Sequence, residues 1–325
     1  MSRSDSRPTK RYERDALPYV LEQINAMGYG LTLGVHTRID EAAMQVVSAA
    51  RIGNVYVNRN VVGAVVGVQP FGGEGLSGTG PKAGGPLYLL RLLQQRPGDA
   101  AAWAVEQSGV PSEVPIQGLI PRTGDTDSAL LALRGWALEQ GRVELCAQCD
   151  RFARQSPVGG WRALAGPTGE ADFYAVLPRE AVLCLAQVDT LLDASLGTLR
   201  DAQLLQQLAA VLAVGSRALW SANCQLLWQS LPSRAQGRVT LVQDWRLDST
   251  GFDVLLFHGK TAELLAVCNV VVARPGPIVG VVRVGVGVGV GVADGDIPLE
   301  RLVVEHSLSI NTAAAGGNAS LMMVG

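Results

Sequence analysis

The sequence predicts an α/β fold, and three observations carry the prediction. Short β-favouring runs alternate with stretches of helical periodicity along most of the 325 residues. Hydrophobic residues make up 48% and charged residues 17% of the chain, as in packed globular proteins, and the length is sufficient for about two domains. The 38 glycines and 16 prolines fall largely between these runs, where they indicate turns.

The N-terminal part predicts a short tail followed by alternating elements. Residues 1–10 are polar and aperiodic, and are expected to be a disordered tail. Apolar residues at helical spacing predict a helix over 17–27, which Gly28 ends. A strand is expected at 31–37, then a second helix from Asp40 to about residue 50.

A β-favouring run at 55–57 leads into a glycine-rich loop, with nine glycines from Gly63 to Gly85. Glycines have no Cβ, so backbone N–H groups of such a loop can turn toward one anion. The alternative is a turn that only reverses the chain. Residues 73–78 also fit G-x-G-x-x-G, but the flanking Pro70 and Pro81 argue against the strand–turn–helix setting of a dinucleotide site.

Beyond residue 93 the composition becomes that of a linker, and a long helix is expected over about 127–155. The helix carries Cys146 and Cys149, a C-x-x-C without a second pair or a nearby His that would complete a zinc site. At least one of the two is therefore interpreted as a core residue. An odd total of five cysteines indicates a reducing compartment, so a cytoplasmic location is expected.

From residue 161 onward strand and helix signals alternate again. Strands at 172–178 and 182–186 are expected to pair as a hairpin and a helix to follow over 198–214, with further strand-like runs at 238–242, 253–257 and 269–273. The alternating Val-Gly repeat at 284–292 has no functional interpretation. A last strand through residues 308–310 is expected. It places Glu305 and His306 on opposite faces, so we interpret these as surface and packing residues.

Charge and hydropathy argue against nucleic-acid binding and against a transmembrane segment. The net charge of −2 provides no basic surface for nucleic acid. Four residues break the longest apolar stretches before they reach the roughly 20 residues that span a bilayer, so no transmembrane segment is expected. They are Arg274, Pro275, Pro277 and Arg283.

The glycine-rich loop also carries a family resemblance. Residues 69–73 (QPFGG) and 77–80 (SGTG) are similar to the closing motif of the aldehyde dehydrogenase superfamily. Residues 58–60 (NRN) and 80–86 (GPKAGGP) narrow the resemblance to the glutamate-semialdehyde dehydrogenase part of proline utilization A. The similarity is continuous over about residues 11–95, and residues 299–325 resemble the terminal motif of the longer members of this family.

The resemblance implies a domain organisation. The chain is expected to be α/β, with a C-terminal piece of an aldehyde dehydrogenase module followed by a degenerate, Rossmann-like domain of the same superfamily. The expected divisions are a disordered tail (1–10), the module with its loop (11–95), a linker and helix (96–160), a non-catalytic Rossmann-like domain (161–292), and a C-terminal strand and lid motif (293–325).

The resemblance also implies the binding residues. In the family the loop holds the α-carboxylate of glutamate semialdehyde, which by position assigns the backbone N–H groups of Gly63 and Ala64, with Phe71 packing against the aliphatic stem of the substrate. The family's nucleophilic cysteine, its general base and its NAD-binding half all lie before this motif, whereas the five cysteines here follow it. No catalytic, cofactor-binding or metal-binding residue is therefore assigned, and no NAD is expected on this chain alone.

Two functions remain open at this point. The first is a fragment of a proline-catabolic, NAD-dependent L-glutamate γ-semialdehyde dehydrogenase that supplies the carboxylate-binding loop and the lid, with the upstream dehydrogenase portion as its partner. The second is a non-catalytic capping or assembly module, which acts only with a partner that carries the cysteine, the glutamate and the NAD site. Association into a homo-oligomer is left open.

Overall fold

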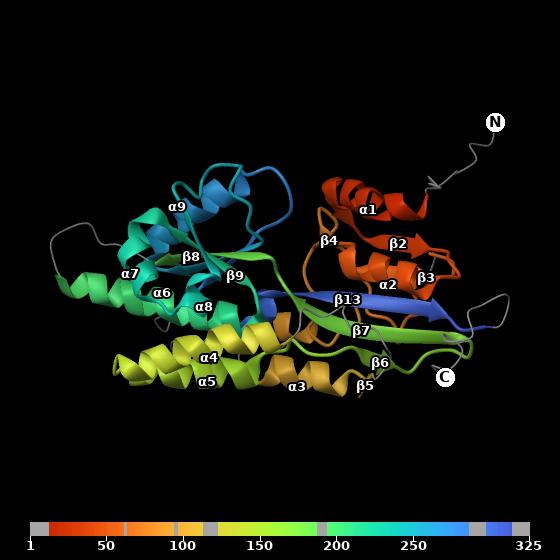
Figure 1. The fold of residues 1–325 in the computed structure, drawn as a ribbon, viewed down its shortest axis with the longest axis horizontal. Helices are drawn as coiled ribbons and strands as arrows, with labels where there is room; N and C mark the ends of the chain where they lie inside the picture. Colours follow the sequence, from red (N-terminus) through yellow and green to blue (C-terminus); the bar gives the residue numbers. More distant parts are fainter. Residues whose placement is uncertain are drawn as a thin grey trace.

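The computed structural model describes residues 13–61, 64–93, 97–112, 123–186, 194–285 and 297–313. The expected tail at 1–10, most of the Val-Gly repeat, Gly63 and the last twelve residues lie outside this part of the chain. Within it, two main sheets lie at opposite ends of the long axis, and helices pack against both (Figure 1). The mixed α/β class expected from the sequence is confirmed.

The larger sheet combines strands from both ends of the chain. Its strand order is β2-β3-β13-β7-β6-β5, in which β2, β3 and β13 run parallel and the remaining neighbours antiparallel. The strands are β2 (Thr32–Val35), β3 (Asn54–Val57), β13 (Val303–Asn311), β7 (Glu170–Pro178), β6 (Arg162–Leu164) and β5 (Val110–Pro111). Strand β13 therefore lies in the middle of the sheet, beside a strand about 250 residues earlier in the chain (Figure 1).

Two N-terminal helices cover one face of this sheet. They are α1 (Leu17–Ala26) and α2 (Asp40–Ala49), and their apolar residues contact side chains of β3, β7 and β13. Phe173 of β7 and Leu308 and Ile310 of β13 belong to the same core as Leu17 and Val46. The core of the N-terminal segment thus includes residues from the C-terminal part of the chain. A two-stranded ladder of β1 (Tyr29–Gly30) and β4 (Glu74–Gly75) completes this end.

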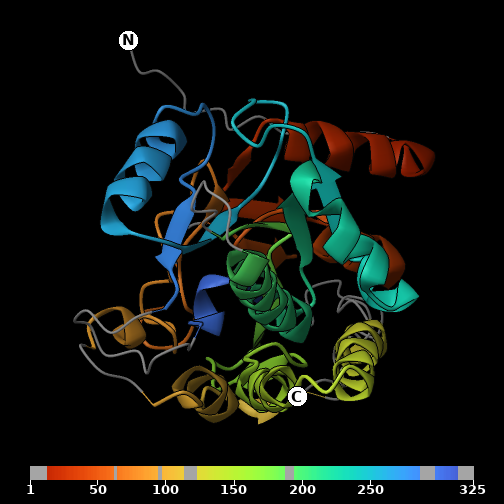
Figure 2. The same cartoon turned by 90° about the vertical axis from the view of Figure 1, so that its left-hand side faces the viewer.

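The second sheet is wholly parallel, with strand order β10-β9-β8-β11-β12. Its strands are β8 (Ala181–Ala186), β9 (Arg217–Ser221), β10 (Val239–Val242), β11 (Val254–His258) and β12 (Gly280–Arg283). Helix α6 (Ala194–Val214) covers one face, and α9 (Thr261–Val272) lies on the other, away from α4 (Thr123–Glu139) and α5 (Val143–Gln155) (Figure 2). This is a Rossmann-like, doubly wound arrangement.

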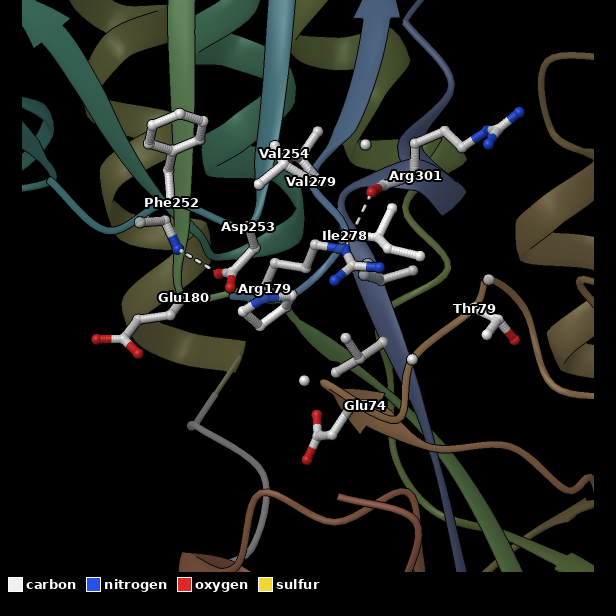
Figure 3. A pocket seen from close by; sticks show the side chains of 18 of the residues that line it. Glu74, Thr79, Arg179, Glu180, Phe252, Asp253, Val254, Ile278, Val279 and Arg301 are labelled. Atoms are coloured by element: carbon white, nitrogen blue, oxygen red, sulfur yellow. Dashed lines mark hydrogen bonds between the residues drawn. The ribbon is translucent and has the colours of Figure 1, made fainter. Parts of the chain in front are cut away.

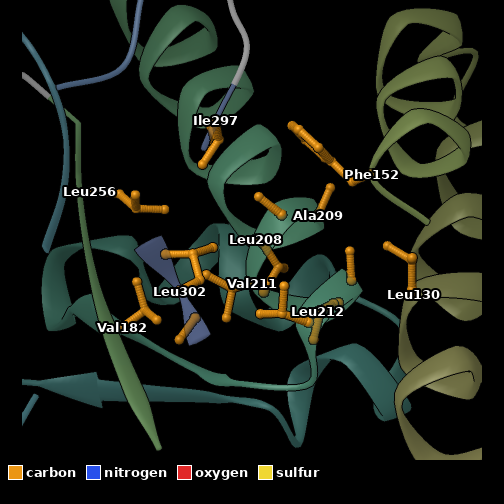
Figure 4. Packing of buried hydrophobic residues seen from close by; sticks show 14 of the residues in the cluster. Leu130, Phe152, Val182, Leu208, Ala209, Val211, Leu212, Leu256, Ile297 and Leu302 are labelled. Atoms are coloured by element: carbon orange, nitrogen blue, oxygen red, sulfur yellow. The ribbon is translucent and has the colours of Figure 1, made fainter. Parts of the chain in front are cut away.

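Helix α6 is the centre of the largest core. It lies between the parallel sheet and the pair α4 and α5, so the apolar residues of its last three turns are buried on nearly every side (Figure 4). Leu208 and Val211 are both 0% exposed. Both cysteines of the C-x-x-C on α5 are also buried here, in agreement with the core interpretation. The structure describes no cluster of three potential metal-ligating side chains, and none of its described helices could span a membrane.

The expected hairpin of residues 172–178 and 182–186 is wrong. Strand β7 pairs with β13 and β6 in the larger sheet, whereas β8 pairs with β9 and β11 in the parallel one. Only Arg179 and Glu180 separate them, and they carry the chain from one sheet to the other. Residues 182 and 183 are both fully buried, as a central strand of a parallel sheet requires, because helices cover both of its faces. Strands β6 and β7 thus lie apart from the parallel sheet, although the expected division assigns them to the same domain.

Two further expectations are corrected. The long helix over 127–155 is two helices, because the backbone at Gly141 adopts a φ of 66°, which ends α4 before α5 begins. The valine-rich run at 269–273 is not a strand but the end of α9. Burial of Val271 against the sheet outweighs the β propensity of that run.

Candidate functional site

The glycine loop, residues 58–85, follows β3, and the backbone of its first residue is in the left-handed region. Asn58 has a φ of 55°. Its side-chain oxygen accepts a hydrogen bond from the N–H of Thr37, and its amide donates to the Thr37 carbonyl, both at 2.9 Å. These two bonds account for an asparagine at a position that most side chains avoid.

The structure describes two of the three residues assigned to the substrate. Gly63 lies outside the described residues. Ala64 is half-buried and precedes a turn in which the N–H groups of Val68 and Gln69 both donate to the Val65 carbonyl. Within the described part of the chain, the N–H of Ala64 has no hydrogen-bond acceptor. Phe71 is half-buried on the returning arm, where it forms an antiparallel bridge with Ala83.

A buried lysine joins the two arms of the loop to β3. The Lys82 side chain is 2% exposed, and its ammonium donates to the Gly53 carbonyl, the Asn54 side-chain oxygen and the Gly72 carbonyl at 2.5, 3.0 and 2.9 Å. Burial lowers the pKa of Lys82 to about 7. The three acceptors satisfy all three donors of the ammonium.

Glu305 of β13 lies beneath the same loop. One of its carboxylate oxygens accepts the N–H of Lys82, and the other accepts the Tyr174 hydroxyl, each at 2.7 Å. Burial raises the pKa of Glu305, and burial beside Glu305 raises the pKa of Tyr174. The interpretation of Glu305 and His306 as surface residues is wrong, because each is 8% exposed in a central strand. His306 Nε2 lies 3.5 Å from the carboxylate of Glu74 in the loop.

A second polar cluster lies at the other end of the loop. The Arg59 guanidinium forms an ion pair with Glu170 of β7, donates to the Ser309 hydroxyl at 2.6 Å, and lies 4.9 Å above the Tyr56 ring. The Gln69 amide donates to Glu170 at 2.7 Å and also to Asp172. Both ends of the segment 58–70 are thereby bonded to strands of the C-terminal part.

A cavity of about 550 Å³ lies beside the loop, between it and the parallel sheet (Figure 3). The Arg179 guanidinium lies between Asp253 and Glu74 in this cavity, and its Nε donates to the Arg301 carbonyl at 3.2 Å. The first residues of β8, β11 and β12 line the cavity, so it faces the amino ends of these strands. Dinucleotides bind at the carboxyl ends of such sheets, and this cavity is therefore not a dinucleotide crevice.

At the carboxyl ends of the parallel strands lies a buried histidine. The Gln207 amide donates to His258 Nδ1 at 2.6 Å and to the Leu185 carbonyl at 3.0 Å. Burial lowers the pKa of His258 to about 4, so the ring is neutral at pH 7. Beyond it, the Lys260 N–H donates to the Glu263 carboxylate at the start of α9. A carboxylate therefore accepts one of the backbone N–H groups at this helix N-terminus, where a pyrophosphate would need such donors.

His258 is expected to make the protein acid-sensitive. An unfolded histidine takes up its proton near pH 6.5, whereas the folded one does so near pH 4. Stability should therefore fall as the pH drops from 6.5 to 4, by up to about 3 kcal/mol, and be unaffected by this residue above pH 6.5. Urea unfolding at pH 7 and pH 5 should show a loss that is larger by about 2 kcal/mol in the wild type than in His258→Gln. Equal losses of stability in the wild type and in His258→Gln would contradict the lowered pKa of His258.

The comparisons with known proteins agree with this architecture. Residues 13–96 match the model of the aldehyde dehydrogenase family. A structure of proline utilization A (PutA) from Corynebacterium freiburgense aligns with 93% of this chain and 25% of its own length, at a TM-score of 0.51 and 22% identity. This alignment supports the fold. The first segment and its loop are thus similar to the aldehyde dehydrogenase family.

Two relatives are also similar to this chain in sequence. Bifunctional protein PutA of Escherichia coli K12 is 50% identical over 97% of this chain, which spans 22% of the length of that protein. A 1-pyrroline-5-carboxylate dehydrogenase of Staphylococcus saprophyticus is 46% identical over 24% of the chain and 15% of its own length. The chain corresponds to a C-terminal portion of PutA.

The sequence predicts the loop but not the contacts that support it. Lys82, Glu305, Arg59 and Gln69 are buried or half-buried polar residues with two or more hydrogen-bond or ion-pair partners. Arg59, Gln69 and Lys82 lie within the motifs that carry the family resemblance, whereas the available signal for Glu305 was its polarity inside an otherwise apolar, β-favouring run.

Proposed function

We propose that this chain supplies the substrate-carboxylate loop and a supporting C-terminal unit to an NAD-dependent L-glutamate γ-semialdehyde dehydrogenase of proline breakdown. The observation that carries the proposal is the anchored glycine loop within a segment that matches the aldehyde dehydrogenase family. In this role Gly63 and Ala64 bind the α-carboxylate through their N–H groups, and Phe71 contacts the aliphatic stem. Among the described residues the N–H of Ala64 has no hydrogen-bond acceptor, and this supports the assignment.

Backbone donors suit this substrate. A carboxylate that leaves water requires hydrogen-bond donors, and main-chain N–H groups provide them without a mobile side chain. The support beneath the loop keeps these groups in a fixed arrangement, so little ordering remains to be done when the substrate binds. The chain's own contribution is thus to bind and orient the substrate next to groups that its partner supplies.

The nucleophile and NAD belong, in this proposal, to the upstream dehydrogenase portion. Three of the five cysteines are held as thiols by burial, which raises the pKa of Cys149 to about 12 and that of Cys184 and Cys224 above the usual range. NAD held by that portion would supply the hydride acceptor for oxidation of the aldehyde. The parallel sheet of this chain serves, in this proposal, as a scaffold without NAD.

The test is NADH formation from glutamate semialdehyde, supplied as its cyclic form pyrroline-5-carboxylate. It is measured with the chain alone, with the upstream portion alone, and with the complete enzyme in which the two are joined. Activity that requires both parts would support the proposal. Full activity of the upstream portion without this chain would contradict it, and would favour a capping or assembly module. Activity of the isolated chain would contradict the absence of a nucleophile.

A further inference from the structure

Four alternate residues of β13 are bonded to the glycine loop. Glu305 accepts the N–H of Lys82 at 2.7 Å, and the Ser307 hydroxyl donates to the Pro70 carbonyl at 2.7 Å. The Ser309 hydroxyl accepts from Arg59 at 2.6 Å and donates to Glu170 at 2.5 Å. The Asn311 amide donates to the Asn58 carbonyl at 3.1 Å. Successive side chains of a strand alternate between its faces, so these four lie in one row.

The row follows the loop from end to end. From Glu305 to Asn311 its contacts move from Lys82 through Pro70 and Arg59 to Asn58, the first residue of the loop. The opposite face of β13 carries Leu308 and Ile310, which pack in the core beneath α1 and α2. The strand thus separates two tasks, with apolar packing on one face and polar contacts to the loop on the other.

A loop rich in glycine needs such contacts. Fixing the backbone of each residue costs about 1–2 kcal/mol, and glycine loses more freedom than any other residue. The bonds from β13 and β7 hold residues 58, 59, 69 and 70, at the two ends of the segment. Residues 60–68 lie between these bonded ends and include the proposed carboxylate donors.

We propose that the polar row of β13 (Glu305, Ser307, Ser309 and Asn311) positions the glycine loop for carboxylate binding, and so sets the preference for aldehydes that carry an α-carboxylate. These are positioning residues, since they act through the loop. The inference rests on the proposed function of Gly63 and Ala64. It assigns substrate selectivity to a strand distant in sequence from the residues that contact the substrate.

Ser309→Ala tests this inference, because it removes one hydroxyl at a site 1% exposed and leaves the ion pair of Arg59 with Glu170. In the complete enzyme, the KM for glutamate semialdehyde should rise about tenfold. The kinetics with an aldehyde of equal length that lacks the carboxylate should stay unchanged, as should the KM for NAD. Ser309→Thr keeps the hydroxyl and should restore the KM.

A second readout is independent of activity. Hydrogen exchange of the backbone N–H groups in residues 58–70 should become faster in Ser309→Ala, while exchange in α6 should not change. Ile310→Val is the matched control, since it lies on the opposite face of the same strand and is 2% exposed. It should lose stability but leave both the exchange of 58–70 and the ratio of the two KM values unchanged.

The outcomes separate the two proposals. Unchanged hydrogen exchange in residues 58–70 would overturn the positioning role, whatever the kinetics of the complete enzyme. An equal change in the KM values for both aldehydes would overturn the proposed role in substrate selectivity. An inactive wild-type complete enzyme would instead refute the proposed function, while the exchange experiment would still decide whether β13 holds the loop.

Discussion

Replacing Glu305 with alanine is expected to lower the free energy of unfolding by about 3 kcal/mol, because the partners of a buried charged group are left unpaired. The Lys82 N–H and the Tyr174 hydroxyl would each lose an acceptor at 2.7 Å. The buried Lys82 ammonium would also lose the negative charge that stabilises it most. Urea unfolding at pH 7, followed by circular dichroism, measures the change.

Two controls distinguish this effect from the loss of an ordinary carboxylate. Glu305→Gln keeps an acceptor oxygen, so a smaller loss of about 1 kcal/mol is expected. Glu180→Ala removes a carboxylate from pairs with Arg51 and Arg217 whose side chains are about half exposed, and should cost under about 1 kcal/mol. If all three variants were equally stable, Glu305 would not organise the buried network.

Leu208→Ala is expected to destabilise the protein by about 3 kcal/mol through the cavity that it leaves in the core around α6. Leu208 is 0% exposed and packs between the parallel sheet and the outer helices (Figure 4). Alanine is at least as good a helix former as leucine, so the helix itself gains no defect. The measurement is again the unfolding free energy.

Leu199→Ala is the matched control, because the same substitution falls on the same helix at a side chain that is 55% exposed. It should change stability by no more than about 0.5 kcal/mol. A loss at Leu208 as small as that at Leu199 would contradict the central position of α6 in the core.

Local patterns were sufficient for most individual elements. The helices at 17–26 and 40–49, the strand at 54–57 and the helix ending at Val214 follow from spacing, caps and glycine stops near their ends. The pairing of strands did not follow from such patterns. The two runs at 172–178 and 182–186 are adjacent and alternate alike, and only the identity of their neighbours in space assigns them to different sheets.

The candidate site, too, was predictable from the sequence only in part. Glycine spacing and the family motif predicted the loop, because backbone conformation and main-chain donors are local properties. Its support comes from Glu170 and Asp172 on one strand and Ser307 and Ser309 on another, more than 100 residues from the loop. A contact between such distant residues leaves no periodic signal in a single sequence. Glu305 therefore resembled an exposed residue until its neighbours in the sheet were known.

The insertion of β13 beside β3 also has a consequence for synthesis. A ribosome that adds about 5–20 residues per second needs roughly 10–50 s to extend the chain from β3 to β13. Throughout that interval the edge of β3 has no partner on one side, and the core beneath α1 and α2 lacks Leu308 and Ile310. An open, apolar strand edge can pair with another nascent chain. The N-terminal segment is therefore expected to be most prone to mispairing before its last strand emerges.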